Sequence, residues 1–194
     1  METKFLFLIS LFASINIIAS AQKIDLDIRY STTPVENNTI CYNPGNKLII
    51  DDFKGKPDEG NRAIAITSSG FSFKAGFRST GVKATLSITV FCNFDKSLSW
   101  MKENGKNEYI LNHEQHHFDI SYLTTLEFIK KMKQQNFTEG NYKEKLRTIY
   151  DVSMQEMETL QHKYDEETQH GQSKEMQIAW DKKIEDRLIF LTSN

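Results

Sequence analysis

The chain has 194 residues, with 24 Lys and Arg against 26 Asp and Glu, so its formal net charge is −2 at pH 7. This length suits one ordinary domain with enough chain to bury a core. The near-neutral charge and the lack of a basic block or stripe interleaved with aromatic residues argue against a nucleic-acid partner.

The first residues have the pattern of a secretory signal. Lys4 precedes an apolar run over 5–18, and Ala19-Ser20-Ala21 supplies the small residues that a signal peptidase recognises. We therefore predict a signal peptide over 1–21, a single domain over 22–194, and a secreted or periplasmic location. The alternative is an uncleaved N-terminal anchor. No second apolar stretch is long enough to span a bilayer, so no membrane span is expected in the mature chain.

Up to about residue 100, the sequence alternates between apolar and polar residues, as half-buried strands do. The pattern is clear over 24–30 and strongest over 84–94, where Leu86, Ile88, Val90 and Cys92 share one face. Shorter strand candidates are 47–50, 63–67 and 70–73, separated by turn residues. These segments predict an antiparallel or mixed sheet.

After residue 100 the apolar period becomes helical. We predict helices over about 108–134 and about 142–168, with Gly171 marking a helix end. Ser173 is a candidate N-cap for a third helix. Strands followed by helices predict an α+β fold, in which the helical C-terminal half follows the sheet.

The two cysteines of the mature chain are Cys41 and Cys92. In an oxidising compartment they could pair, and the alternative is two buried free thiols. Neither belongs to a C-x-x-C arrangement, which disfavours a cysteine-based zinc site.

The chemistry-bearing motif is H-E-x-x-H, formed by His113, Glu114 and His117 within the first predicted helix. Residues four apart lie one turn above each other on the same helix face, so both imidazoles can bind one Zn²⁺ ion. Glu114 lies about 100° round the helix from His113, where it can flank the metal and take a proton from water. The motif predicts zinc as the cofactor, His113 and His117 as ligands, and Glu114 as the catalytic base. The alternative is a histidine cluster on an ordinary helix.

Two neighbouring residues are not expected to bind the metal. His116 lies about 60° from the ligand spacing, and we interpret it as a supporting or surface residue. Asp119 points away from both predicted ligands.

A catalytic zinc site needs a third protein ligand. The candidates lie in the segment 164–171 at the end of the second predicted helix, which could pack antiparallel to the first. His170, beside the helix-ending Gly171, is the first choice, and Glu167 is the second. The other interpretation of this segment is a solvated acidic helix end.

Several separated motifs resemble a known family. They are Asp51-Asp52-Phe53-Lys54-Gly55-Lys56-Pro57, Ser99-Trp100, His113-Glu114-Gln115-His116-His117-Phe118-Asp119-Ile120 and Tyr164-Asp165-Glu166-Glu167-Thr168-Gln169-His170-Gly171, the last followed by Gln177 and Trp180. In this combination the chain resembles the bacterial domain of unknown function 922 family, whose members are described as predicted secreted zinc-dependent proteases.

The resemblance implies specific roles. His113 and His117 would be zinc ligands, Glu114 the catalytic base, and His170 a third ligand. Tyr164 would stabilise an oxyanion through its phenol, and the alternative for it is simple packing on the apolar face of the second predicted helix.

We therefore expect a zinc-dependent metallopeptidase that hydrolyses peptide or amide bonds in a peptide or protein substrate. The alternatives are a non-catalytic metal-binding or structural protein of the cell envelope, and a binding module without metal. The sequence leaves the substrate and the oligomeric state open.

Overall fold

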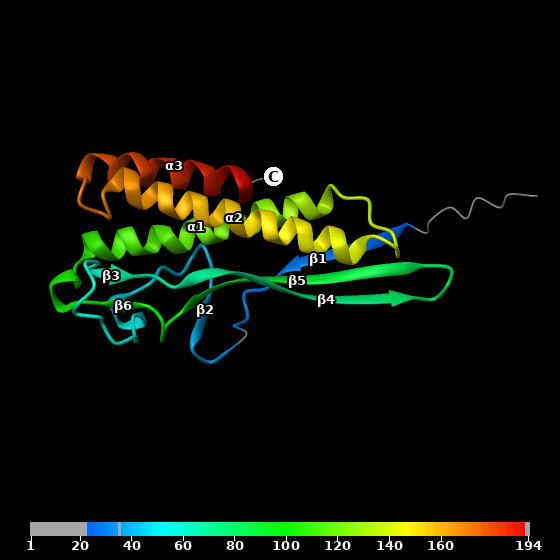
Figure 1. Ribbon diagram of the computed structural model, residues 1–194, viewed down its shortest axis with the longest axis horizontal. Helices are drawn as coiled ribbons and strands as arrows, with labels where there is room; N and C mark the ends of the chain where they lie inside the picture. The colour runs from blue at the N-terminus through cyan, green and yellow to red at the C-terminus, as the bar shows by residue number, and fades with distance from the viewer. Residues whose placement is uncertain (1–22, 35, 193–194) are drawn as a thin grey trace, which may run out of the picture.

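The computed structural model describes residues 23–34 and 36–192, in which a layer of helices lies over a sheet (Figure 1). The predicted α+β class is confirmed, with strands in the first half of the chain and helices in the second. The predicted signal peptide over 1–21 lies outside the described residues. Within these residues, no helix combines the length and the apolar character that a membrane span needs.

The sheet is built around its longest strand, β5 (Ala84–Asp95). Strand β1 (Ile24–Tyr30) pairs with it in parallel, whereas β2 (Thr39–Cys41) and β4 (Ser69–Ser79) pair with it in the antiparallel direction. The sheet is therefore mixed, which is one of the two arrangements that the sequence predicts.

The core lies between this sheet and the helices. The inward face of β5 is almost completely buried, and its residues are Leu86, Ile88, Val90, Cys92 and Phe94, each exposed by at most 1%. Phe128 and Met132 from the first helix and Met157 from the second pack against the same cluster as Leu86. The alternating pattern of the strand thus identifies the face that supports the helices.

Three helices follow: α1 (Glu108–Lys133), α2 (Tyr142–Thr168) and α3 (Lys174–Thr192). The first begins at Asn107, whose side chain accepts a hydrogen bond from the backbone N–H of Ile110. Each predicted helix is confirmed, and α1 and α2 agree with their predicted bounds to within one residue.

The end of α2 positions part of the candidate site. Gln169 and His170 have φ of 53° and Gly171 has φ of 77°, so the chain leaves the helix in the left-handed conformation. The backbone N–H of His170 donates to the Asp165 carbonyl oxygen at 2.7 Å. Ser173 caps the next helix, since its Oγ accepts from the N–H of Met176.

A small second sheet consists of β3 (Ala65–Ile66) and β6 (Trp100–Met101), and two single-turn 3₁₀ helices, η1 (Ile50–Asp52) and η2 (Glu103–Gly105), complete the fold. The strand expected over 47–50 is wrong. The backbone N–H of Leu48 donates to the side-chain oxygen Oε1 of Gln115 on α1 at 2.8 Å, and η1 begins two residues later.

Cys41 and Cys92 are buried free thiols. In the ladder Cys41 lies opposite Asn93, and its Sγ donates to Asn93 Oδ1 at 3.1 Å. Cys92 is the adjacent residue on β5 and therefore points to the opposite face of the sheet. The two thiols are thus directed apart, which explains why they are unpaired.

Gly55, in the first resemblance motif, lies against the loop that leads to β6. Its N–H donates to the Ser99 carbonyl oxygen at 2.8 Å. A Cβ at Gly55 would lie 2.7 Å from the Ser97 carbonyl oxygen and 2.8 Å from that of Ser99. Because both atoms are backbone, the clash cannot be relieved by a side-chain rotation.

We predict that Gly55→Ala lowers the free energy of unfolding by about 1–3 kcal/mol, as overpacking does elsewhere. The matched control is Gly76→Ala in β4, where a Cβ would meet nothing within 4 Å. Urea denaturation of the two variants and the parent measures the difference. Equal stability of the two variants would contradict this account of Gly55.

Candidate metal centre

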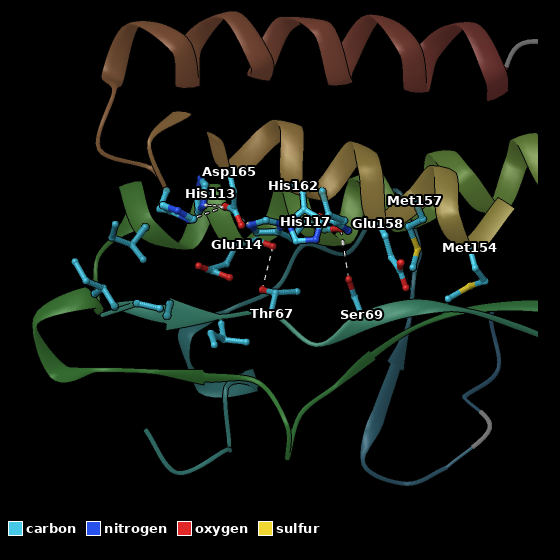
Figure 2. A pocket seen from close by; sticks show the side chains of 17 residues that line it. Thr67, Ser69, His113, Glu114, His117, Met154, Met157, Glu158, His162 and Asp165 are labelled. Carbon is cyan, nitrogen blue, oxygen red and sulfur yellow. Dashed lines mark hydrogen bonds and ion pairs between the residues drawn. The ribbon is translucent and has the colours of Figure 1, made fainter. Parts of the chain in front are cut away.

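The predicted ligands His113 and His117 lie one turn apart on α1, facing α2 (Figure 2). Asp165 on α2 completes a group whose ligand atoms all lie within 4.8 Å of one another. Within the described residues, no other group of three or more histidine, cysteine or acidic side chains could hold a metal ion in this way.

The Asp165 carboxylate is the common contact of the two imidazoles. Its Oδ1 lies 3.1 Å from Nε2 of His117 and 3.3 Å from Nε2 of His113. The two imidazole rings are perpendicular, with centroids 4.9 Å apart. Nε2 of each ring therefore points towards the Asp165 carboxylate.

A glutamine contacts the other nitrogen of each ring. His117 Nδ1 lies 2.5 Å from Gln161 Oε1, while Gln161 Nε2 donates to the His117 carbonyl oxygen at 2.8 Å. His113 Nδ1 lies 3.0 Å from Gln177 Oε1. Because an amide oxygen only accepts, each Nδ1 carries a proton. Nε2 of each ring is therefore the nitrogen that can bind a metal ion, or donate to Asp165 when no metal is bound.

The pKa values of Asp165 and His117 are both shifted from their ordinary values by their neighbours in this group. Burial by itself would raise the pKa of Asp165, but the hydrogen bonds with His113 and His117 outweigh it and hold that pKa well below its ordinary value. Burial would lower the pKa of His117, but the hydrogen bond with Asp165 and the charge of Glu114 outweigh it, so that pKa is raised. Both shifts have the same cause, which is the close contact between the Asp165 carboxylate and the imidazoles.

The donor chemistry fits a metal ion. Two lone pairs and one carboxylate oxygen repel one another unless a cation lies among them. Two imidazoles and one carboxylate are a known ligand set for catalytic zinc. Metal-bound histidines also commonly donate their second N–H to an acceptor, as both do here.

Glu114 lies beside this group without belonging to it. Its side chain is 4% exposed, and its Oε2 is a buried atom that has no hydrogen-bond partner within the described residues. Thr67 anchors the same turn of helix by donating through Oγ1 to the Glu114 backbone carbonyl oxygen. A buried carboxylate oxygen without a partner is rare, and it is available to a molecule that enters the cleft.

The cleft has a volume of about 600 Å³ and lies between the segment 63–67, which contains β3, and one face of α2 (Figure 2). The three-residue group His113, His117 and Asp165 lies in its wall together with Glu114. Its other lining side chains are apolar residues next to polar ones, among them Ile64, Ile66, Met154, Met157, Glu158 and His162.

The two predicted candidates for a third ligand occupy different positions. His170 lines the cleft, and its Nδ1 lies 3.6 Å from Asp165 Oδ1, but its side chain is 73% exposed and it is not a member of the three-residue group. Glu167 points to α3, where its Oε2 accepts from Trp180 Nε1 at 2.8 Å. The structure thus brings His170, and not Glu167, next to the predicted ligands.

Tyr164 is fully buried and lies behind His113. Its ring stacks on the His113 imidazole with centroids 4.7 Å apart, and its hydroxyl donates to Gln177 Oε1 at 2.9 Å. The residue is not part of the cleft wall. The position of Tyr164 thus agrees with simple packing, which is the second of the two interpretations that the sequence allows.

His116 and Asp119 lie on another face of α1, as expected. His116 Nδ1 is 2.8 Å from Asp119 Oδ2, and both side chains are buried away from the cleft.

The sequence reasoning did not single out Asp165, Gln161 or Gln177. The sequence held a usable signal for Gln161 and Asp165, because they are four residues apart and lie on either side of the apolar position Tyr164 in the sequence. That spacing puts Gln161 and Asp165 on one helix face. Gln177 gave no such signal, because its contact depends on how α3 packs.

A model of the bacterial family of proteins of unknown function called DUF922 matches residues 52–171. The match contains the H-E-x-x-H helix, Asp165 and His170, and it ends before α3. Comparisons with curated proteins and with solved structures found no match.

We predict that Asp165→Ala weakens zinc binding by more than the roughly 10–100-fold loss typical of residues that only support a ligand. His170→Ala should weaken it less, because His170 is exposed and outside the group. Titration with a competing chelator measures both affinities. Glu166→Ala, an exposed neighbour, is the control. A larger loss in His170→Ala than in Asp165→Ala would reverse the assignment of the third ligand.

Proposed function

This chain belongs to the DUF922 family, and on that premise we propose that it is a zinc-dependent metallohydrolase of the H-E-x-x-H type that cleaves peptide bonds. The observation that carries the proposal is the buried, unpartnered Oε2 of Glu114 beside the group formed by His113, His117 and Asp165. A metal-binding group that served stability alone would not need such a carboxylate.

The three ligand atoms suit zinc, because catalytic zinc sites combine three protein ligands with one open position. In our proposal His113, His117 and Asp165 hold the ion, and the exposed imidazole of His170 lies beside them in the lining of the cleft. Zinc bound there supplies a Lewis acid that polarises a carbonyl oxygen and makes water more acidic.

Glu114 is the proposed general base. Its Oε2 accepts a proton from the attacking water as the water oxygen forms a bond to the carbonyl carbon. When the carbon–nitrogen bond breaks, Glu114 passes the same proton to the leaving nitrogen, which departs as an amine. The carboxylate is thus unchanged after one cycle.

Tyr164 has a supporting role in this proposal. Its hydroxyl is occupied by Gln177 and its ring stacks on His113, so the residue fixes the plane of the ligand.

The cleft supports a peptide as the substrate. Its volume of about 600 Å³ is within the usual range for ligand sites. It runs along the segment 63–67, and the apolar side chains of Ile66, Met154 and Met157 can receive the side chains of an extended chain. The predicted signal peptide over 1–21 supports an action outside the cytoplasm.

We predict that Glu114→Gln retains zinc and lowers peptide hydrolysis by about 10²–10⁴-fold, because an amide cannot take the proton. Hydrolysis of a fluorogenic peptide mixture and metal analysis of the same samples measure the two effects. The matched control is Glu108→Gln, on an exposed position of the same helix, which should hydrolyse like the parent.

The same assay tests the alternative of a non-catalytic metal-binding or structural protein of the cell envelope. In that case zinc raises the melting temperature of the parent while no peptide is cleaved. Cleavage that a chelator abolishes and zinc restores would exclude it, and full activity in Glu114→Gln would refute the proposed mechanism.

A further inference from the structure

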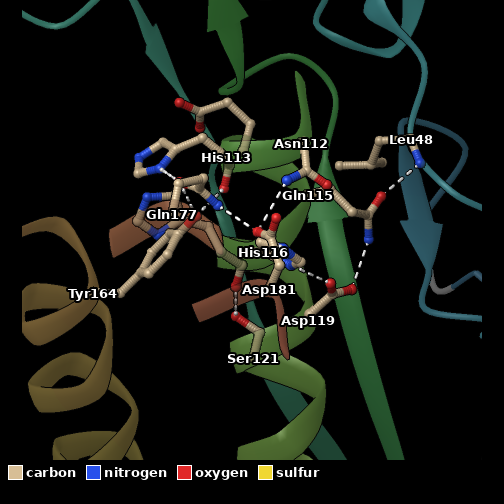
Figure 3. Close-up of polar contacts among 12 residues, drawn as sticks. Leu48, Asn112, His113, Gln115, His116, Asp119, Ser121, Tyr164, Gln177 and Asp181 are labelled. Carbon is tan, nitrogen blue, oxygen red and sulfur yellow. Dashed lines mark hydrogen bonds and ion pairs between the residues drawn. The ribbon is translucent and has the colours of Figure 1, made fainter. Parts of the chain in front are cut away.

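Helix α3 follows the segment that matches the family, yet it contributes a direct contact to a predicted ligand. Gln177, which is 1% exposed, lies with its Oε1 3.0 Å from Nδ1 of His113 (Figure 3). The opposite nitrogen of that ring faces Asp165.

The direction of the Gln177 amide follows from its partners. Its Nε2 donates to Asp181 Oδ1 at 2.8 Å, and the Tyr164 hydroxyl donates to its Oε1 at 2.9 Å. A carboxylate only accepts hydrogen bonds, so the amide nitrogen faces Asp181 and the amide oxygen faces His113.

Asp181 is itself held in place by residues of α1. Its Oδ1 accepts from Asn112 Nδ2 at 3.1 Å and contacts His116 Nε2 at 2.8 Å. The other nitrogen of His116 contacts Asp119 Oδ2 at 2.8 Å.

Asp119 extends this network to the loop before η1. Its Oδ1 accepts from the Tyr42 hydroxyl at 2.9 Å and from Gln115 Nε2 at 2.8 Å. A continuous set of hydrogen bonds thus connects that loop, α1 and α3 to one imidazole of the candidate metal centre.

We propose that Gln177 is a positioning residue for His113, and that Asp181 fixes the direction of its amide. Gln177 keeps the proton of the imidazole on Nδ1, which leaves Nε2 free to bind the metal. If the amide were reversed, its NH₂ group would face Nδ1, the proton would move to Nε2, and the ligand would be lost. This inference rests on the proposed metal-dependent function, but it concerns α3 and not the hydrolytic step.

The test compares Gln177→Leu and Asp181→Ala with the parent. The first removes the acceptor, and the second leaves the acceptor but frees the amide to reverse. Both should weaken zinc binding by about 10–100-fold in titrations against a competing chelator. The control is Gln172→Leu, the same substitution at an exposed position between α2 and α3, which should bind zinc like the parent.

A second measurement separates positioning from a purely structural role. In the metal-free protein, ¹⁵N NMR of the His113 ring should show a protonated Nδ1 in the parent. In both variants Nδ1 should lose this proton, and the remaining proton should lie on Nε2, which faces Asp165. Asp181 has a side chain that is 40% exposed, so Asp181→Ala keeps the test valid if Gln177→Leu unfolds.

The possible results are distinct. Parent-like zinc affinity or an unchanged His113 proton position in a folded variant would overturn the positioning role. A parent protein that binds zinc but cleaves no peptide would refute the proposed function alone, since neither measurement here uses a substrate.

Discussion

The contact of one carboxylate with two imidazoles, across the packing of α1 against α2, is the interaction on which the candidate site depends. Asp165 reaches Nε2 of both His113 and His117 because the adjacent residue, Tyr164, is fully buried against α1 and α3. Rotation by one residue would turn Asp165 about 100° away from the histidines. The apolar core thus sets the geometry of the polar centre.

Helix packing also determines which groups contact Nδ1 of His113 and His117, the ring nitrogens opposite Asp165. Gln161 from α2 and Gln177 from α3 each offer an amide oxygen to one ring, so two different helices impose the same proton position on the two histidines. A fold with α1 and the sheet alone would place the histidines but would leave their rings free to rotate. This gives the three-helix layer a chemical role beyond burial of the core.

The sequence patterns correctly predicted the features that depend only on the local geometry of a strand or a helix. The alternation in β5 and the i, i+4 spacing of His113 and His117 depend only on strand and helix periods, and both were predicted from the sequence. Asp165 was passed over in favour of His170, because the choice depends on how α2 crosses α1. The strand expected near Leu48 failed for a similar reason: its backbone N–H pairs with the Gln115 side chain, which is 67 residues away.

The opposite orientations of Cys41 and Cys92 have a consequence for how the chain can be made. No covalent cross-link holds β2 to the central strand, so the native topology needs neither an oxidant nor a disulfide isomerase. We therefore expect thiol reductants to leave the sheet intact, because it contains no disulfide bond to reduce.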